Sequence, residues 1–327
     1  MKLIPLTPPA PVLGLYASPD AAAYYRVAVP MGALAPDGAA VQYGHGTTAH
    51  REAARIVVFA RLSGDLAGNL SAIEAHQAEG RRVLIDYDDD PDTLPSRSLS
   101  ARERALLDTM RALMRAADGL VTTNATLAAR LRRYHPDVRV VPNYVRPMDW
   151  PEPAAAGPVV TLTGSISHIA DWRMVAQPLA AALTKHPAAR LRVAGHLPSY
   201  LRPLCADHRS WTGTLSAYPA MLAGSGIGLC PLPATAFNEA KSPIKLYEFA
   251  LSGAAVIGSP TQYGPVLRAA GLDHAVARSS ADWRRLLDHY LSDPAARQHD
   301  ARTLRAYVTT ALDAARHTAT IRAAYAA

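Results

Sequence analysis

Short runs of β-branched and apolar residues alternate with longer helix-forming segments along most of this 327-residue chain. Such alternation builds βαβ units, in which a crossover helix joins two parallel strands. The pattern pauses at 142–158 (PNYVRPMDWPEPAAAGP), whose Pro and Ala content predicts an interdomain linker, and then restarts. The sequence therefore predicts an α/β protein of two doubly wound, Rossmann-like domains facing a central cleft, with ligands beyond the carboxyl ends of the strands.

The predicted domain boundaries follow from the position of this linker. Residues 1–150 are expected to form the first domain and 151–305 the second, with 306–327 continuing a long C-terminal helix. The expected strands cover 25–29, 55–59, 82–86, 119–122, 138–141, 159–163, 189–194, 227–230 and 255–258. The expected helices cover 63–79, 98–117, 125–134, 174–186, 218–222, 245–252, 280–292 and 295–326.

Composition narrows the class of protein. Hydrophobic residues make up 49% of the chain and charged residues 19%, which is typical of a globular protein. With only two cysteines, Cys205 and Cys230, a disulfide framework and a cysteine-based zinc site are not expected. Prolines interrupt the N-terminal apolar stretch, and no run reaches the length of a membrane span. We expect a cytoplasmic protein, in solution or peripheral at a membrane.

The positive charge is unevenly distributed. The net charge is +7. Residues 1–150 hold 17 Lys/Arg and 16 Asp/Glu, a net of +1, and residues 151–327 hold 17 and 11, a net of +6. An excess in the second half suits a bound polyanionic small molecule at least as well as a nucleic-acid track.

Lysine is rare and concentrated in one segment. Of the 34 basic residues only four are Lys, and two of these, Lys241 and Lys245, lie four residues apart in FNEAKSPIKLYEFALSGAAVIGS, residues 237–259. Ser242 and Pro243 predict a helix start, and a helix N-terminus suits a phosphate. Lys245 and Glu248 share one face of that helix, so one could hold phosphate and the other accept ribose hydroxyls. The alternative is a capped surface helix with a local ion pair.

A second loop follows the strand at 159–163. It reads TLTGSISHIAD from Thr161 to Asp171, and a helix is expected after Asp171. Gly164 allows a close backbone approach and Ser165 adds a hydroxyl, so this loop could bind a diphosphate. His168 and Asp171 are expected to form a cap or a loop hydrogen bond, because no third metal ligand is evident.

Acidic residues gather after the strand at 82–86. Asp86, Asp88, Asp89 and Asp90 follow one another in RRVLIDYDDDPDTLP. Clustered carboxylates can supply a base or hold a divalent cation, or this loop can simply cap the next helix. We expect at least one of them to face the cleft.

Other first-half features are less specific. Tyr24, Tyr25 and Arg26 are expected on the first strand, and His45, between two glycines, on an exposed loop that could contact an acceptor or be plain surface. A basic face on the helix at 98–117 is expected to be solvated, with membrane or nucleic-acid contact as an alternative. The chain lacks GxxxxGK[ST], GxSxG and a GxGxxG after a strand, which argues against P-loop ATPases, α/β-hydrolases and ordinary NAD dehydrogenases.

Together these segments resemble the GT-B glycosyltransferases, in particular the retaining, family-4-like group. The specific likeness runs from TLTGSISHIADWRMVAQPLAAALTKHPAARLRVAGHLP through GIGLCPLPATAFNEAKSPIKLYEFALSGAAVIGSP to Tyr263. The first half matches more loosely, through DYDDDPDTLP, VTTNATLAARLRRY and VVPNYV.

The resemblance implies a role for each matching residue. The donor would be a nucleotide-diphospho-sugar bound by the second domain, and 306–327 would cross back onto an acceptor-side first domain. Gly164 and Ser165 would lie against the diphosphate, Lys245 would neutralise it and Glu248 would bind the ribose. Asn238, Glu239 and Lys241 would approach the sugar or the phosphate. Many members of the group have two glutamates eight residues apart, whereas Glu239 and Glu248 are nine apart.

On the acceptor side, Arg26, His45 and Asp86 are candidate contacts. Asp88 and Asp89, with Glu239, are candidate catalytic residues that orient or deprotonate the acceptor hydroxyl. Neither a metal nor a cofactor is expected.

The expected activity is transfer of a sugar from the nucleotide sugar to an acceptor hydroxyl, with retention, on a saccharide or a lipid-linked saccharide. One alternative is a phage-type enzyme that glycosylates a modified DNA base. Others are a non-catalytic nucleotide-sugar-binding module and a phosphorylase or epimerase on the same scaffold.

Overall fold

A computed structural model describes residues 9–16, 18, 20–35, 39–43, 47–62, 64–93, 100–153, 156–211 and 215–326. The chain divides into two compact units. The first-half unit comprises Lys2–Val145, Glu239–Ser242 and Ala314–Ala327, and the second-half unit comprises Arg146–Asn238 and Pro243–Asp313. The short segment Glu239–Ser242 thus packs with the first half although both its neighbours in sequence belong to the second, which the sequence pattern did not indicate.

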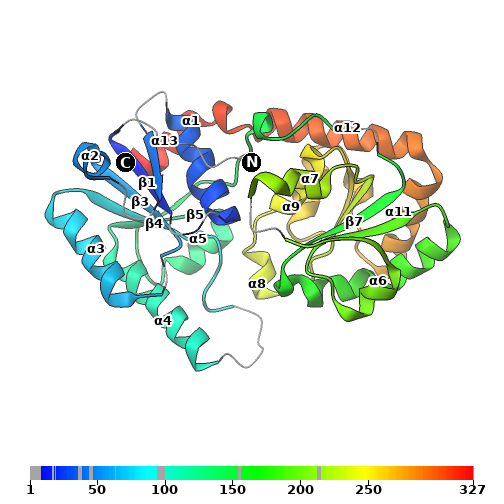
Figure 1. Ribbon diagram of the computed structural model, residues 1–327, viewed down its shortest axis with the longest axis horizontal. Coiled ribbons are helices and arrows are strands. Elements are labelled where there is room, and N and C mark those ends of the chain that lie inside the picture. The colour runs from blue at the N-terminus through cyan, green and yellow to red at the C-terminus, as the bar shows by residue number, and fades with distance from the viewer. Residues whose placement is uncertain are drawn as a thin grey trace. The chain divides into compact units, whose positions relative to one another are not determined.

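The first-half unit is built on a parallel six-stranded sheet of order β2-β1-β3-β4-β5-β6 (Figure 1). Its strands are β1 (Val12–Tyr16), β2 (Ala39–Tyr43), β3 (Ile56–Ala60), β4 (Arg82–Asp86), β5 (Gly119–Thr122) and β6 (Val138–Val140). The central strand residues Val83, Leu84 and Ile85 are fully buried, as expected where helices cover both faces of a parallel sheet.

Helices from both ends of the chain cover this sheet. They are the π-helical turn η1 (Ala23–Ala28), α1 (Val29–Leu34), α2 (Thr48–Ala53), α3 (Leu66–Ala78), α4 (Ala101–Ala116), α5 (Ala125–Leu131), the 3₁₀ turn η8 (Ala314–Arg316) and α13 (Thr318–Ala326). Helix α4 begins with a capping box between Ser100 and Glu103. The expected strand at 25–29 was wrong, since these residues are helical.

The second-half unit has a parallel five-stranded sheet of order β11-β10-β7-β8-β9. Its strands are β7 (Val159–Gly164), β8 (Arg190–Gly195), β9 (Cys205–Arg209), β10 (Ile227–Cys230) and β11 (Ala255–Gly258). Its helices are α6 (Ile169–Lys185), α7 (Tyr218–Leu222), α8 (Ala236–Glu239, whose last residue falls in the first-half unit), α9 (Ile244–Leu251), α10 (Tyr263–Ala269), α11 (Ser280–Ser292) and α12 (Pro294–Ala311). Trp172 from α6 and Trp283 from α11 are buried in its core.

Two helix boundaries differ from expectation. Helix α6 begins at Ile169, so Asp171 lies inside its first turn and not before it. The single helix expected over 295–326 is interrupted between α12 and η8, where the Ala314 amide donates to the carbonyl of Val145, 2.9 Å away. Among the described residues no helix is long and apolar enough to cross a membrane.

Candidate functional site

The loops that follow β7, β10 and β11 meet at the carboxyl edge of the second-half sheet, because the three strands are adjacent and parallel. The backbone is tightly packed where β7 and β8 end. A Cβ on Gly195, which has a φ of +110°, would lie 2.3 Å from the Gly164 carbonyl oxygen, and a Cβ on Gly164 would lie 2.8 Å from His168. Only glycine fits at either strand end, so the backbone after β7 is held in a close turn.

That turn carries Ser165, which is exposed and has its hydroxyl 2.8 Å from that of Ser167. The next residue of interest, His168, is buried with its Nδ1 2.9 Å from Asp171 Oδ2. This is the loop hydrogen bond expected from the spacing of the two residues. Asn238 donates to the other oxygen of Asp171, at 3.2 Å, and to the Pro233 carbonyl, at 3.0 Å. The Asn238 side chain, expected to approach the donor, is therefore buried and ties the β10 loop to the first turn of α6.

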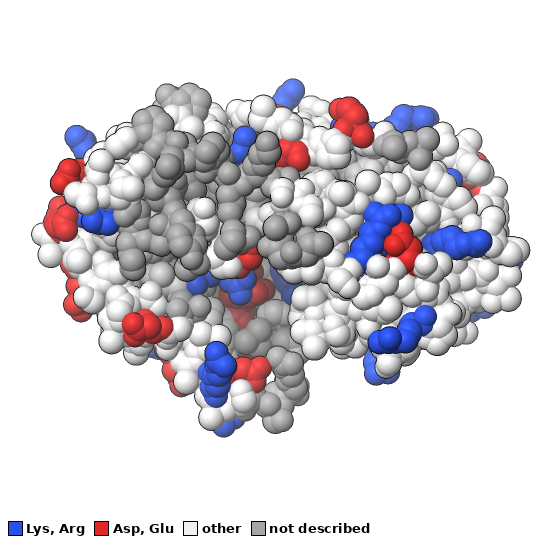
Figure 2. Space-filling view, viewed as in Figure 1, with Lys and Arg blue, Asp and Glu red and all other residues white. Residues whose placement is uncertain are grey.

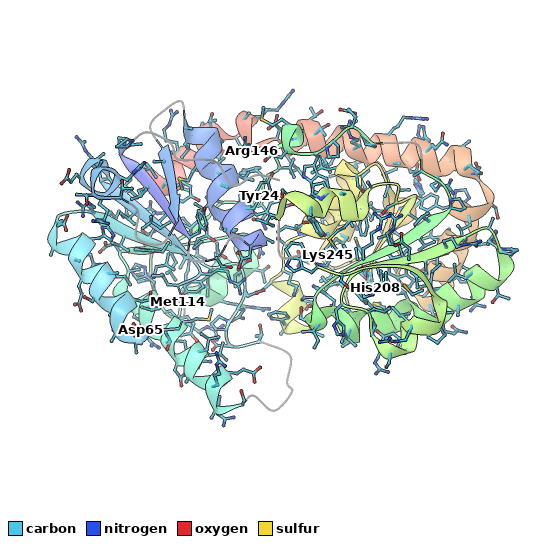
Figure 3. All side chains as sticks on the ribbon, viewed as in Figure 1. Tyr24, Asp65, Met114, Arg146, His208 and Lys245 are labelled. Carbon is cyan, nitrogen blue, oxygen red and sulfur yellow. The ribbon has the colours of Figure 1, made fainter. Side chains whose placement is uncertain are left out.

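Helix α9 begins at Ile244 and brings Lys245 and Glu248 to the end of β10 (Figure 3 labels Lys245). Lys245 is half-buried and Glu248 is buried. Both lie close enough to Cys230, the last residue of β10, to act on its thiol, whose pKa is raised by burial, lowered by Lys245 and raised by Glu248. The cation and the carboxylate lie three residues apart on α9, near the carboxyl end of β10.

A tyrosine fixes the carboxylate. The Tyr218 hydroxyl donates to Glu248 Oε2 at 2.8 Å and lies 3.1 Å from Thr163 Oγ1, one residue before Gly164. Because the single phenolic hydrogen points to Glu248, the Thr163 hydroxyl is the donor in the second contact. Burial and the Glu248 charge together raise the pKa of Tyr218 well above its ordinary value, so this hydroxyl stays a donor at any physiological pH. Tyr218 and Thr163 were not singled out from the sequence, where nothing distinguishes them from core residues.

The segment Glu239–Ser242, which leads into α9, is held by three side chains of the first-half unit. Asn124 donates to the Ala240 carbonyl at 2.7 Å, and Asn143 donates to the Ser242 hydroxyl at 2.7 Å. Arg130 lies 3.4 Å from Glu239. Lys241 lies in the middle of this segment, half-buried.

These contacts correct the expected helix start. Ser242 is not the cap of α9, because Pro243 occupies that position without a side-chain cap bond. The Ser242 hydroxyl instead accepts a hydrogen bond from Asn143. The helix starts close to the expected position, but Ser242 does not cap it.

Arg26 and Asp86 form a buried pair in the first-half unit. Arg26 Nε and Nη2 donate to the two Asp86 oxygens at 2.7 and 2.9 Å, and Nη1 donates to the Val141 carbonyl and to Asn143 Oδ1, both at 2.7 Å. Burial raises the pKa of Asp86 to about 6, and the charge of Arg26 acts in the opposite direction. Since neither side chain has any exposed surface, neither can contact an acceptor in this conformation, contrary to their expected role.

The rest of the acidic loop is more accessible. Asp88 and Asp89 lie 3.3 and 3.9 Å from the guanidinium of Arg61, and both are part-exposed. Arg61 has a φ of +49°, a left-handed conformation that costs a non-glycine residue about 1 kcal/mol or more and concentrates at functional sites. Asp90 is buried, bonding the Asp92 amide and the Thr93 hydroxyl, so it shapes the loop. Sequence reasoning missed Arg61, since backbone strain has no signature in composition.

The remaining site predictions concern His45 and a metal ion. His45 lies outside the described residues. Within the described part of the chain, no group of three or more His, Cys, Asp or Glu side chains is arranged to hold a metal ion.

Comparison with known proteins shows a family match over part of the chain and a known fold. Residues 173–326 match the family described as glycosyl transferase-like. No curated protein matches the chain in sequence. Solved structures show the fold, which is that of the GT-B glycosyltransferases.

Three solved structures illustrate the likeness. WaaG, a glycosyltransferase involved in lipopolysaccharide biosynthesis, has a TM-score of 0.63 at 14% identity, with 97% of this chain and 100% of that chain covered. A glycosyltransferase of avilamycin A biosynthesis has a TM-score of 0.58 at 14% identity, covering 97% of each chain. A mutant of S. aureus TarM with Fondaparinux, alpha-GlcNAc-glycerol and UDP has a TM-score of 0.60 at 8% identity, covering 84% of this chain and 56% of that one. This chain therefore spans little more than half the length of TarM.

Proposed function

We propose that this protein is a glycosyltransferase that moves a sugar from a nucleotide-diphospho-sugar to an acceptor hydroxyl. The observation that carries the proposal is the position of Glu248, which Tyr218 links to Thr163 at the carboxyl end of β7, with Lys245 three residues earlier on the same helix. Ligands of doubly wound sheets bind at the carboxyl edge of the sheet. The glycosyl transferase-like family match over 173–326 supports the same assignment, because it contains Tyr218, Lys245 and Glu248.

In this proposal the diphosphate lies along the close turn after β7. The Gly164–Ser165 backbone approaches it without a side chain in the way, and Lys245 offsets its charge. Negative charge grows on the diphosphate as the glycosidic bond breaks, so a fixed ammonium stabilises the transition state more than the ground state. Glu248 accepts the ribose hydroxyls; a carboxylate has about four acceptor positions, so the bond from Tyr218 does not exhaust it.

The acceptor would be a saccharide or a lipid-linked saccharide, and transfer would proceed with retention. The part-exposed Asp88 and Asp89, held beside Arg61 at the carboxyl edge of the first-half sheet, are the proposed acceptor-side carboxylates. Glu239 is the third candidate, and its contact with Arg130 would set its direction. The involvement of WaaG in lipopolysaccharide biosynthesis agrees with this class of acceptor.

The face of the molecule shown in Figure 2 gives no support to the DNA-base alternative. On the face shown in Figure 2 the described basic side chains are interspersed with acidic ones and form no continuous basic track. A duplex-binding protein is expected to present such a track.

A donor panel tests the proposal. UDP-, GDP-, ADP- and dTDP-sugars are screened by thermal shift and by hydrolysis, since a donor at 100 times its Kd stabilises the fold by about 2.7 kcal/mol. With the donor found, Lys245→Ala and Glu248→Ala should each lower kcat/KM by at least tenfold. Lys185→Ala, which removes an exposed lysine paired with Asp288, is the control and should leave kcat/KM unchanged. Wild-type turnover in both site variants would disprove the assignment.

A further inference from the structure

A pocket of about 270 Å³ lies beneath α12 in the second-half unit. Its lining includes Pro153, Ala156, Gly226, Gly253 and three arginines of α12, Arg297, Arg302 and Arg305. No Asp or Glu of the described residues lines it. We refer to it as the α12 pocket.

The α12 pocket is on the opposite edge of the sheet from the proposed donor site. Gly226 directly precedes β10, Gly253 lies two residues before β11, and Pro153 and Ala156 lie in the segment that enters β7. These positions are the amino ends of the three adjacent strands whose carboxyl ends carry Gly164, Cys230 and Gly258. Strands of four to six residues at ~3.3 Å per residue separate the two edges by roughly 13–20 Å. One small ligand cannot occupy both.

The spacing along α12 brings the arginines together. Arg297 and Arg305 are eight residues apart and so lie two helical turns apart on one face, with Ala301 between them, and Arg302 lies three residues before Arg305. Ala301 leaves room between the guanidinium groups.

The hydrogen-bonding capacity of these guanidiniums is only partly used. Arg297 is buried and donates to the carbonyls of Tyr290, at 3.0 Å, and Ala156, at 3.5 Å. No carboxylate of the described residues is within ion-pair distance of Arg297 or Arg302, and burial lowers the pKa of Arg297 with no acidic neighbour acting against it. Arg305 pairs with the exposed Glu152 at 3.1 Å, while its own Nε is buried without a hydrogen-bond partner among the described residues.

Two glycines allow close packing of the backbone in the wall of the pocket. A Cβ on Gly226 would lie 2.2 Å from the Gly157 carbonyl oxygen and 3.5 Å from Arg297 Nε. Gly253 has a φ of +83°, and a Cβ there would lie 2.4 Å from Pro153. Larger residues at these two positions would clash with the segment that enters β7, and at Gly226 the backbone lies next to Arg297.

We propose that the α12 pocket is a second ligand site that binds a small soluble phosphate-bearing anion. Arginine matches phosphate because its planar fork donates two parallel hydrogen bonds. The volume admits a phosphate group with a small organic substituent and is too small for a whole nucleotide sugar, since ligand pockets for molecules of that size are roughly 300–1,000 Å³.

Inorganic phosphate is the probe. Its affinity is measured by calorimetry and by the shift in Tm at constant ionic strength, with chloride as the replacement anion. Arg302→Gln and Arg305→Gln should each weaken phosphate binding at least tenfold, and Arg302 is exposed, so its replacement should leave the fold intact. Arg284→Gln, which removes the same charge from an exposed position on α11, should bind phosphate as the wild type does.

Lys245→Ala separates this site from the donor site. If the α12 pocket binds phosphate, this variant should retain the wild-type affinity. The proposal is overturned if chloride reproduces the Tm shift, if Arg302→Gln and Arg305→Gln bind as the wild type does, or if Lys245→Ala alone abolishes binding. None of these results depends on glycosyl transfer, so the proposed activity can fail while the pocket stands.

Discussion

Tyr218 directs the Glu248 carboxylate through a single hydrogen bond at the edge of the second-half sheet. Its ring packs edge-on against Trp150 and Trp211, with centroid distances of 6.4 and 5.8 Å. An aromatic ring held on two sides places its hydroxyl with little freedom, and hydrogen bonds between a neutral and a charged group are stronger than neutral ones. Tyr218 is thus a positioning residue for the proposed ribose contact.

Replacing Tyr218 by Phe tests that role. Loss of a hydrogen bond to a charged group costs about 1.5 kcal/mol, so donor KM should rise about tenfold, with a smaller change in kcat. Steady-state kinetics with varied donor measures both. Tyr290→Phe is the matched control, since Tyr290 donates to the Asp300 carboxylate at 2.7 Å elsewhere in the same unit. An unchanged donor KM in Tyr218→Phe would contradict the positioning role.

The Arg26–Asp86 pair predicts a stability effect. Asp86→Asn leaves a buried guanidinium without its counter-charge and should cost about 3–5 kcal/mol in free energy of unfolding. Removing both charges, with Arg26→Met and Asp86→Leu together, should recover more than half of that loss. Urea unfolding of the single and double variants measures the difference, and additive losses would show that the pair is not coupled.

Individual site residues were predicted from the rarity of a residue type and from its spacing in the sequence. Two of four lysines in one segment led to Lys245 and Glu248, which lie three residues apart on α9. The roles of Arg61, Tyr218 and Asn143 could not be read the same way, because each depends on a partner 25 or more residues away. Arg26 was misplaced because aromatic and β-branched neighbours are typical of strands, whereas here they form a buried helix.

At the scale of elements, buried strands were the most predictable part of the fold. The ranges 82–86, 119–122, 227–230 and 255–258 agree with the structure at both ends. The strands β1, β2 and β9 were missed. Strand β9 alternates between half-buried and exposed residues and contains Asp207, His208 and Arg209, so its apolar signal is weak. Edge strands of this kind are specified by pairing with a neighbour more than by their own residues.

Helix α13 contributes Ile321 and Tyr325, both fully buried, to the core of the first-half unit. The Tyr325 hydroxyl is buried and has no hydrogen-bond partner among the described residues. Tyr325→Phe should therefore be neutral or stabilising, whereas Tyr325→Ala should cost about 3–5 kcal/mol through the cavity it leaves. Thermal and urea unfolding compare the two, and a large loss in Tyr325→Phe would reveal a bond that the structure does not show.

On the scale of the whole molecule, the first-half unit is assembled from three separate stretches of chain. The Ala314 amide bonds the Val145 carbonyl, Tyr144 stacks on His317 at 4.3 Å, and Arg139 donates to the Ala324 carbonyl at 2.8 Å. The alternation of strands and helices predicts two Rossmann-like units, but it cannot show which distant stretch completes each one. Which stretches complete a unit depends on contacts between residues far apart in sequence, and such contacts produce no periodic pattern in the sequence.

A fragment of residues 1–145 should consequently fold poorly. The fragment retains the core residues around Ile73. It lacks α13 and the segment Glu239–Ser242, so the apolar and polar surfaces that contact them would be exposed. Circular dichroism should show a broad transition with a Tm well below that of the intact chain. Addition of a peptide spanning 314–326 should raise that Tm, and a fragment that melts as sharply and as high as the full protein would show that the unit is independent.

The position of Glu239–Ser242 also bears on engineering. Asn124, Arg130 and Asn143 were matched to these four residues and not to the remainder of the second half. A hybrid made by joining the first 150 residues of one glycosyltransferase to the rest of another would take the segments equivalent to Glu239–Ser242 and Ala314–Ala327 from the second protein. These segments would then not match the first-half unit against which they pack. Exchange of donor preference between such proteins would accordingly require four junctions, at 145/146, 238/239, 242/243 and 313/314, so that Glu239–Ser242 and Ala314–Ala327 stay with the first-half unit.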